Sequence, residues 1–124
     1  MTARQNVLLP MRLSSVGRRE RRRRAGFLLD TLGIAHCADR TPDRMSGGEQ
    51  QRAAIATALA NDPRLLLADE PTGELDSSTA QDVFSALQTA NTELGVTMLV
   101  VTHDPAVSSQ VRRTIAIKIG RAHV

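Results

Sequence analysis

The chain has 124 residues, 41% of them hydrophobic, which is enough for one modest core and therefore at most one domain. Its single cysteine, Cys37, excludes an intramolecular disulfide and fits a reducing cytosol. No apolar run is long enough to cross a bilayer and the N-terminus shows no signal-peptide core, so any membrane association is expected to be peripheral, through a partner.

The net charge of +3 is unevenly distributed along the chain. Residues 1–44 carry 10 arginines against 4 acidic residues, and most of this excess lies in RRERRRR, Arg18 to Arg24. Nucleic-acid binding requires aromatic stacking residues or a recognisable motif beside such a run, and neither is present. The run continues into AGFLLDTL, whose apolar residues follow helical spacing. We therefore interpret it as the solvated start of an amphipathic helix and expect no nucleic-acid partner.

The first half of the chain predicts two helices. Residues 1–15 are mixed in character and are interrupted by Pro10. A helix is expected over about 17–33, and a second one begins after Ser46. The residues expected to bound the first of these helices are Ser14 or Ser15 at its start and Gly33 at its end.

The second half of the chain predicts an alternation of strands and a helix. The apolar runs at 65–69 and 96–101 are typical of short strands that are buried on both faces. Between them, residues 78–94 place their apolar side chains on one helical face, and Gly95 is expected to end that helix. The run RTIAIKI, residues 113–119, alternates in polarity and predicts a half-exposed strand.

A strand, a helix and a second strand in this order form a βαβ unit, so the two strands are expected to be parallel. Both strands then end at the same edge of the sheet, where open α/β sheets bind their ligands. One strand delivers Asp69 and Glu70 to this edge, and the other delivers Thr102, His103 and Asp104. The predicted fold class is α/β, with parallel strands and flanking helices.

Two acids with a nearby histidine are typical of metal-assisted hydrolysis. Asp69 is placed to hold Mg²⁺, and Glu70 to polarise an attacking water. The alternative is that both acids cap the helix that begins near Ser77, but residues 71–73 separate them from it. His103 taken alone is equally consistent with a hydrogen-bonded structural role.

A second candidate element is SGGEQQR, Ser46 to Arg52. Two glycines before a helix expose backbone N–H groups at its positive end, which favours binding of an anion such as a phosphate. Taken alone, a plain helix cap is the more common explanation of this pattern. Its position just before a strand that ends in Asp-Glu strengthens the functional interpretation.

Together, MSGGEQQRAAIATAL, LLLADEPTGELD and LVVTHD resemble the signature motif, Walker B strand, D-loop and H-loop of an ABC-type ATPase, in that order and at that spacing. The resemblance implies a partial P-loop NTPase-type domain. Residues 1–45 would be a remnant of its α-helical subdomain, and residues 46–118 would be part of the ATPase core.

The resemblance also implies the cofactors ATP and Mg²⁺ and a role for each matching residue. Ser46, Gly47, Gly48 and Glu49 would contact the γ-phosphate of ATP held by an opposite subunit, Asp69 would serve Mg²⁺, Glu70 would be the general base, Asp76 the D-loop acid and His103 the switch histidine. The implied partners are a second nucleotide-binding subunit and a transmembrane permease, on the cytoplasmic face of the cell membrane.

One feature of the sequence leaves the transported cargo open, and another limits the expected activity. SGGEQQR with ADEPTGELD is most similar to ATPases of lipoprotein release and of macrolide or peptide export, but Gly73-Glu74 departs from the more usual Gly-Asn and leaves the cargo unassigned. The phosphate-binding pattern G-x-x-x-x-G-K-[ST] occurs nowhere in the sequence. We therefore expect an ATPase part that is inactive alone. The alternative is a non-catalytic interaction fragment that binds a partner through its signature face or through Arg18 to Arg24.

The last six residues, IGRAHV, correspond to the translation of a widely used short-read sequencing adapter. We expect residues 119–124 to derive from that adapter, and the alternative is a native turn at Gly120-Arg121. Without further strands beside them, the runs at 65–69 and 96–101 are also expected to leave an exposed flank and unpaired edges.

Overall fold

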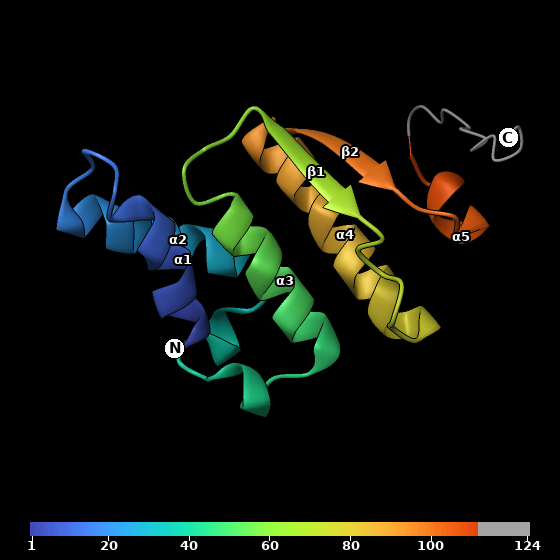
Figure 1. The fold of residues 1–124 in the computed structure, drawn as a ribbon, viewed down its shortest axis with the longest axis horizontal. Helices are drawn as coiled ribbons and strands as arrows, with labels where there is room; N and C mark the ends of the chain where they lie inside the picture. The colour runs from blue at the N-terminus through green and yellow to red at the C-terminus, as the bar shows by residue number, and fades with distance from the viewer. Residues whose placement is uncertain (112–124) are drawn as a thin grey trace, which may run out of the picture.

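The computed structural model describes residues 1–111, so the strand expected at 113–119 and the segment 119–124 lie outside the described residues. The described part is helical at first and ends in a strand–helix–strand unit with a short last helix (Figure 1). The elements are α1 (Ala3–Met11), α2 (Arg18–Thr31), the 3-10 turns η1 (Ala35–Cys37) and η2 (Pro42–Arg44), α3 (Gly47–Ala58), β1 (Leu65–Asp69), α4 (Ser77–Leu94), β2 (Thr97–Val101) and α5 (Pro105–Ser108).

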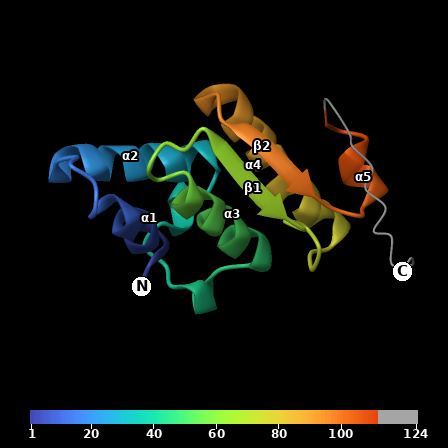
Figure 2. The ribbon, with the colours of Figure 1, turned by 45° about the horizontal axis from the view of Figure 1, so that its top comes forward.

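β1 and β2 form a parallel pair, as the βαβ pattern predicts. Leu65 lies opposite Thr97, and the register runs without a bulge to Asp69 opposite Val101. Both strands therefore end at the same edge of the sheet. α4 lies behind the pair, while α1, α2 and α3 gather on the side of β1 (Figures 1 and 2). The α/β fold class is confirmed.

The prediction that both strands are buried on both faces is wrong for the described structure. Leu66 is 8% exposed and belongs to the buried core, and Met98 and Val100 of β2 are partly buried against the same core. On the opposite face, large apolar side chains are about half exposed: Leu65 at 57%, Leu67 at 63%, Leu99 at 52% and Val101 at 49%. The apolar runs make both faces of the strands suitable for burial, but no element of residues 1–111 covers this second face.

α1 was not predicted, because Pro10 interrupts the segment. Its start is a capping box: the Thr2 hydroxyl accepts from the Gln5 N–H, and the Gln5 side chain accepts from the Thr2 N–H. Pro10 lies in the last turn of α1. Ala3, Val7 and Met11 repeat every four residues and are buried, and this spacing was the available signal for a helix.

The expected cap of the second helix is also corrected. Gly17, not Ser14 or Ser15, is the N-cap of α2 and makes no side-chain bond, while the Ser14 hydroxyl donates to the Met11 carbonyl of α1. Gly33 ends the helix as predicted, with φ of 74°. The Gly33 N–H donates to the Asp30 carbonyl, and the Ile34 N–H donates to the Leu29 carbonyl.

The helices meet at a close approach between α3 and α4. A Cβ on Gly48 would lie 2.6 Å from Cγ2 of Thr79, so only glycine lets α3 approach α4 here. Arg52 of α3 fixes the other side of the helix, since its Nη1 donates to the carbonyls of Leu32 at 3.3 Å and Gly33 at 3.4 Å. Within residues 1–111, no helix has both the length and the hydropathy of a membrane span.

Candidate functional site

Glu70 lies directly after β1 and is anchored to the end of β2. Its N–H donates to the Val101 carbonyl at 2.7 Å, and its φ of 48° turns the chain out of the strand through the left-handed region. One carboxylate oxygen, Oε1, accepts from Nδ1 of His103 at 2.6 Å and from the His103 N–H at 3.2 Å. The other oxygen, Oε2, accepts from the Thr102 hydroxyl at 3.3 Å. The structure therefore brings the predicted Glu70 and His103 together.

The contact between Glu70 and His103 shifts both side chains toward their charged forms. The hydrogen bond from His103 lowers the pKa of Glu70 below its ordinary value of 4.5. The same hydrogen bond raises the pKa of His103 above its ordinary value of 6.5. Between pH 4.5 and pH 6.5 the pair therefore consists of a carboxylate and an imidazolium. At neutral pH, which lies above the lowered pKa of Glu70, this side chain is deprotonated.

Asp69 is the last residue of β1 and is exposed. Among residues 1–111 its carboxylate makes no hydrogen bond or ion pair, in contrast to that of Glu70. An open carboxylate at the carboxyl edge, with a second one beside it, matches the oxygen ligands that Mg²⁺ takes together with substrate phosphates. The residues present therefore fit the Mg²⁺ that the sequence pattern implies.

Ser46 begins α3 with a capping box. Its hydroxyl accepts from the Glu49 N–H at 3.1 Å, and the Glu49 carboxylate oxygen Oε1 accepts from the Ser46 N–H at 3.0 Å. The plain helix cap left open by the sequence is thus present. The N–H groups of Gly47 and Gly48 in the first turn carry none of the hydrogen bonds described for residues 1–111, so they stay available at the positive end of the helix.

Asp76 is the N-cap of α4, where its carboxylate accepts from the Thr79 N–H at 2.8 Å. Hydrogen bonds from Thr79 lower the pKa of Asp76. Asp69 and Glu70 therefore do not cap α4, in agreement with the sequence argument. Asp76 stands next to α3 in the fold, because its bonding partner Thr79 is also the residue that Gly48 closely approaches.

One neighbour of this region, His36, was not predicted from the sequence. Nε2 of His36 in η1 lies 2.8 Å from Oε2 of Glu49. The hydrogen bond from the Ser46 N–H, and then this contact with His36, lower the pKa of the glutamate. Cys37 is fully buried next to it. His36 and Glu49 are 13 positions apart in the sequence and follow no local pattern, so only the folded arrangement reveals the pair.

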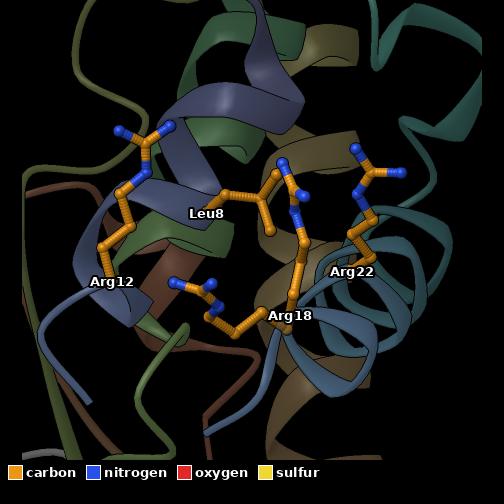
Figure 3. A pocket seen from close by; sticks show the side chains of 5 residues that line it. Leu8, Arg12, Arg18 and Arg22 are labelled. Atoms are coloured by element: carbon orange, nitrogen blue, oxygen red, sulfur yellow. The ribbon is translucent and has the colours of Figure 1, made fainter. Parts of the chain in front are cut away.

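A separate concave surface lies between the end of α1 and the start of α2 (Figure 3). Leu8 and four arginines line it, namely Arg12, Arg18, Arg21 and Arg22. None of these four guanidinium groups pairs with a carboxylate in the described part of the chain. The neighbouring Arg23 and Arg24 are paired instead, with Glu20 at 2.6 Å and Asp62 at 3.5 Å.

Two parallel strands, the first ending in Asp69 with Glu70 directly after it, and a helix capped by Ser46 that begins with two glycines are the arrangement expected of part of an ATP-binding cassette with an α/β fold. The family model for ABC transporters matches residues 1–73, and the chain belongs to this family.

Similar proteins include an ATP-binding protein of a lipoprotein-releasing system and a macrolide export ATP-binding/permease protein. The chain is 48% identical over 120 residues to the lipoprotein-releasing system ATP-binding protein LolD of Gluconobacter oxydans, covering 97% of this chain and 52% of that protein. It is 47% identical over 122 residues to the macrolide export ATP-binding/permease protein MacB of Syntrophobacter fumaroxidans, covering 97% of this chain and 17% of that protein. The chain thus spans about half the length of LolD and a smaller part of MacB.

Solved structures support the fold assignment. The dimeric structure of MJ0796, a bacterial ABC transporter cassette, matches with a TM-score of 0.72 at 43% identity and covers 88% of this chain and 49% of its own. CbiO1 from Clostridium perfringens, part of the ABC transporter complex cbiONQ, matches with a TM-score of 0.78 at 32% identity, covering 83% of this chain and 41% of its own.

Proposed function

We propose that the chain supplies the catalytic carboxylate and the signature face of an ABC-type ATPase, which hydrolyses ATP to drive transport. The observation that carries this proposal is Glu70, held at the carboxyl edge of the sheet by His103 and Thr102. A deprotonated glutamate with a fixed orientation is suited to accept a proton from an attacking water. His103 acts as the residue that orients it.

The remaining residues of the proposal bind phosphate and metal. Asp69 would hold Mg²⁺, which supplies positive charge against the phosphate oxygens. The free N–H groups of Gly47 and Gly48 at the positive end of α3, with Ser46 beside them, would contact the γ-phosphate of ATP on a second subunit. Glu49 fixes the geometry of that first turn through its bond to the Ser46 N–H.

The proposed partners follow from this division of the site. The sequence lacks the G-x-x-x-x-G-K-[ST] pattern that cradles the β- and γ-phosphates, so hydrolysis requires another polypeptide segment that supplies it. We propose assembly with a second nucleotide-binding subunit and with a transmembrane permease, which would hold the chain at the cytoplasmic side of the membrane. A lipoprotein-release or macrolide-export system is the proposed class, since LolD and MacB are among the similar proteins.

A chimera tests the catalytic proposal. The first half of Gluconobacter oxydans LolD would be joined to residues 1–118 of this chain at the matching position, and Mg²⁺-dependent phosphate release would be measured. Glu70→Gln should reduce turnover by about 100-fold or more, because the base is lost. Glu74→Gln is the matched control, since Glu74 is an exposed acid of the same loop, and it should leave turnover unchanged. Normal hydrolysis by the Glu70→Gln chimera would remove Glu70 from this role.

The concave arginine surface supports a second candidate function, a non-catalytic contact with an acidic protein. Its four unpaired guanidinium groups surround Leu8, which fits an acidic segment that also carries an apolar side chain. Binding of the chain to a poly-glutamate peptide should weaken as salt rises and should be lost in an Arg18→Glu, Arg22→Glu variant. Arg19→Glu is the control on the same helix, because Arg19 does not line the surface. If Arg19→Glu lost peptide binding to the same extent, the binding would depend on net charge and not on the concave surface.

A further inference from the structure

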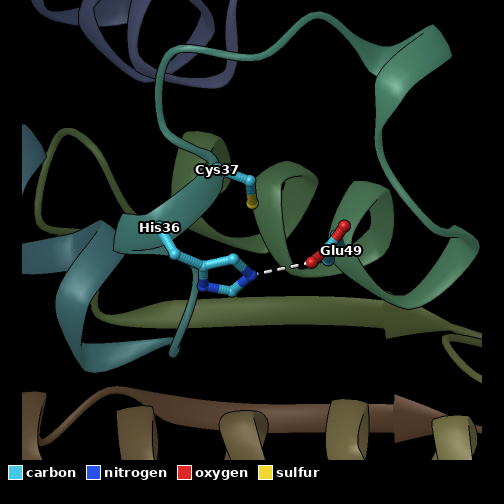
Figure 4. A group of neighbouring side chains, drawn as sticks. All are labelled: His36, Cys37 and Glu49. Atoms are coloured by element: carbon cyan, nitrogen blue, oxygen red, sulfur yellow. Dashed lines mark hydrogen bonds and ion pairs between the residues drawn. The ribbon is translucent and has the colours of Figure 1, made fainter.

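Three side chains with different metal-ligand chemistry meet between η1 and the first turn of α3 (Figure 4). His36 offers an imidazole nitrogen, Cys37 a thiol and Glu49 a carboxylate oxygen, and these ligand atoms all lie within 4.8 Å of one another. In the part of the chain that the structure describes, no other group of three such side chains comes this close.

The two carboxylate oxygens of Glu49 have different hydrogen-bond partners. Oε1 accepts from the Ser46 N–H at 3.0 Å and completes the cap of α3, whereas Oε2 lies 2.8 Å from Nε2 of His36. A cation that replaces the shared proton between Oε2 and Nε2 therefore leaves the cap intact. The exposed fractions also differ, with the side chain of His36 at 56% and that of Glu49 at 17%, so the site opens to solvent on the histidine side.

We propose that His36, Cys37 and Glu49 form a Zn²⁺ site, with a water as the fourth ligand on the exposed side. Zinc accepts sulfur, nitrogen and oxygen donors together, at about 2.3 Å for sulfur and about 2.0–2.2 Å for the other two. Tetrahedral bonds of these lengths place the donor atoms about 3.3–3.6 Å apart. The His36–Glu49 contact must widen by about half an ångström and the thiol must approach, which rotation of the exposed His36 allows. Mg²⁺ and Ca²⁺ do not fit, because they select oxygen ligands.

Metal binding at this site releases protons in a defined way. The Cys37 thiol donates to the Ile34 carbonyl at 3.4 Å, and burial raises its pKa. Zn²⁺ binds the thiolate and the neutral imidazole, so the thiol proton, and any second proton on the imidazole, pass to solvent. The negative charge of Glu49 also raises the pKa of Cys37, whereas the positive charges of Arg40 and Arg52 lower it and offset part of this cost.

The proposed site stands independently of ATP hydrolysis, because its three ligands are argued from their own geometry. A bound ion would join η1 to the first turn of α3 and would stabilise the folded chain against unfolding. The ion would also bind Glu49, which directly follows the two glycines at the start of α3.

Cobalt provides the decisive measurement, because a thiolate bound to Co²⁺ gives a charge-transfer band in the near ultraviolet. The chain contains one cysteine, so such a band reports Cys37 alone. Titration of the purified chain with Co²⁺ under reducing conditions should produce the band, and added Zn²⁺ should remove it. His36→Gln should weaken Co²⁺ binding at least tenfold, and Cys37→Ser should abolish the band.

His103→Gln is the matched control, because His103 forms the other close histidine–glutamate pair of the described structure but has no cysteine beside it. This variant should bind Co²⁺ as the unaltered chain does. Because His36 is exposed, His36→Gln tests the site even where Cys37→Ser disturbs the core, and far-ultraviolet circular dichroism of each variant monitors the fold. Absence of the band, or an unchanged band and affinity in His36→Gln, would overturn the proposed site.

Discussion

At the scale of single residues, Glu70 shows how the fold turns a sequence pattern into a reactive group. Its backbone leaves β1 with φ of 48°, a conformation that costs free energy for a residue with a side chain. Bonds to Val101, Thr102 and His103 at the end of β2 hold that conformation in place. The neighbouring Asp69 keeps ordinary strand geometry and an open carboxylate. The two adjacent acids therefore suit the different proposed roles, metal binding for Asp69 and activation of water for Glu70.

The Glu70–His103 pair predicts a defined pH dependence. The imidazolium contributes stabilisation that is complete below the ordinary histidine pKa of 6.5 and is lost as pH rises through its raised value. The carboxylate contributes stabilisation that is complete above 4.5 and is lost as pH falls through its lowered value. The contact should be strongest between these limits.

Nuclear magnetic resonance titration of the histidine ring protons checks this prediction. The resonance of His103, assigned as the one absent from His103→Gln, should report a pKa above 6.5 in the unaltered chain. Glu70→Gln should return that pKa toward 6.5, because the charged partner is gone. A His103 pKa that is equal in both proteins would show that the pair does not form in solution.

Gly48 carries a second prediction at this scale. Gly48→Ala places a methyl group 2.6 Å from Cγ2 of Thr79, and overpacking of this kind costs about 1–3 kcal/mol of unfolding free energy. Gly26→Ala is the matched change inside α2, where nothing lies within 4 Å, and it should stabilise the chain by about 0.5–1 kcal/mol. Urea unfolding measures both.

Removal of the clashing methyl provides the internal check on Gly48. Thr79→Ser deletes Cγ2, so the double variant Gly48→Ala, Thr79→Ser should recover most of the stability lost in Gly48→Ala. No recovery would mean that glycine is needed at this position for a reason other than the approach of α4.

The residues at the edge of the sheet could be anticipated because their position depends on strand order. Asp69, Glu70 and His103 were placed at one edge because parallel strands must end together, and the structure confirms that Glu70 and His103 meet. The contact of His36 with Glu49 depends on how the loop after α2 folds back over α3. No spacing rule describes that loop, so the pair could not be predicted from the residue pattern.

At the scale of elements, the boundaries follow capping chemistry wherever a side chain supplies it. Ser46 and Gly95 bound their helices as predicted, because a hydroxyl cap and a left-handed glycine are local signals. α2 begins at Arg18 after the N-cap Gly17, which has no side chain that could signal the start of a helix. α1 was missed because Pro10 suggested a break, yet it lies in the final turn, where the buried repeat of Ala3, Val7 and Met11 is already complete.

The cap of α3 yields a prediction for this scale. Ser46→Ala should lower the unfolding free energy by about 1 kcal/mol, because the Glu49 N–H loses its acceptor and the capping box is broken. Ser46→Asn should keep most of the stability, since its side-chain oxygen accepts the same bond. Urea unfolding gives the free energies, and amide hydrogen exchange in the first turn of α3 localises the change.

Ser77→Ala serves as the comparison for that cap. Ser77 is the first residue of α4 and is exposed, but the cap there is Asp76, so its loss should change stability by less than about 0.5 kcal/mol. Equal destabilisation by both alanine variants would show that the hydroxyl of Ser46 is not acting as a specific cap.

At the scale of the whole molecule, the two sides of the sheet differ. α4 covers one face, whereas Leu65, Leu67, Leu99 and Val101 expose about half of their surface on the other. Apolar runs in the sequence predicted strands correctly, but burial on both faces requires something that covers the second one. The chain spans about half of LolD, and the described residues contain no element that serves this purpose.

The exposed face predicts self-association of the chain at high concentration. Within residues 1–111 its apolar side chains are uncovered and each strand has a partner on one side only, and both features favour contact between copies. Leu67→Lys with Leu99→Glu should reduce light scattering and binding of a hydrophobic dye, while circular dichroism stays unchanged. These positions lie opposite each other in the register, so the new charges attract across the strands and the pair is preserved. Leu66→Lys, one residue away on the face that α4 covers, should instead unfold the chain. If the double variant associates as strongly as the unaltered chain, the attraction between copies arises elsewhere, with the arginine-lined surface as the next region to test by the same measurement.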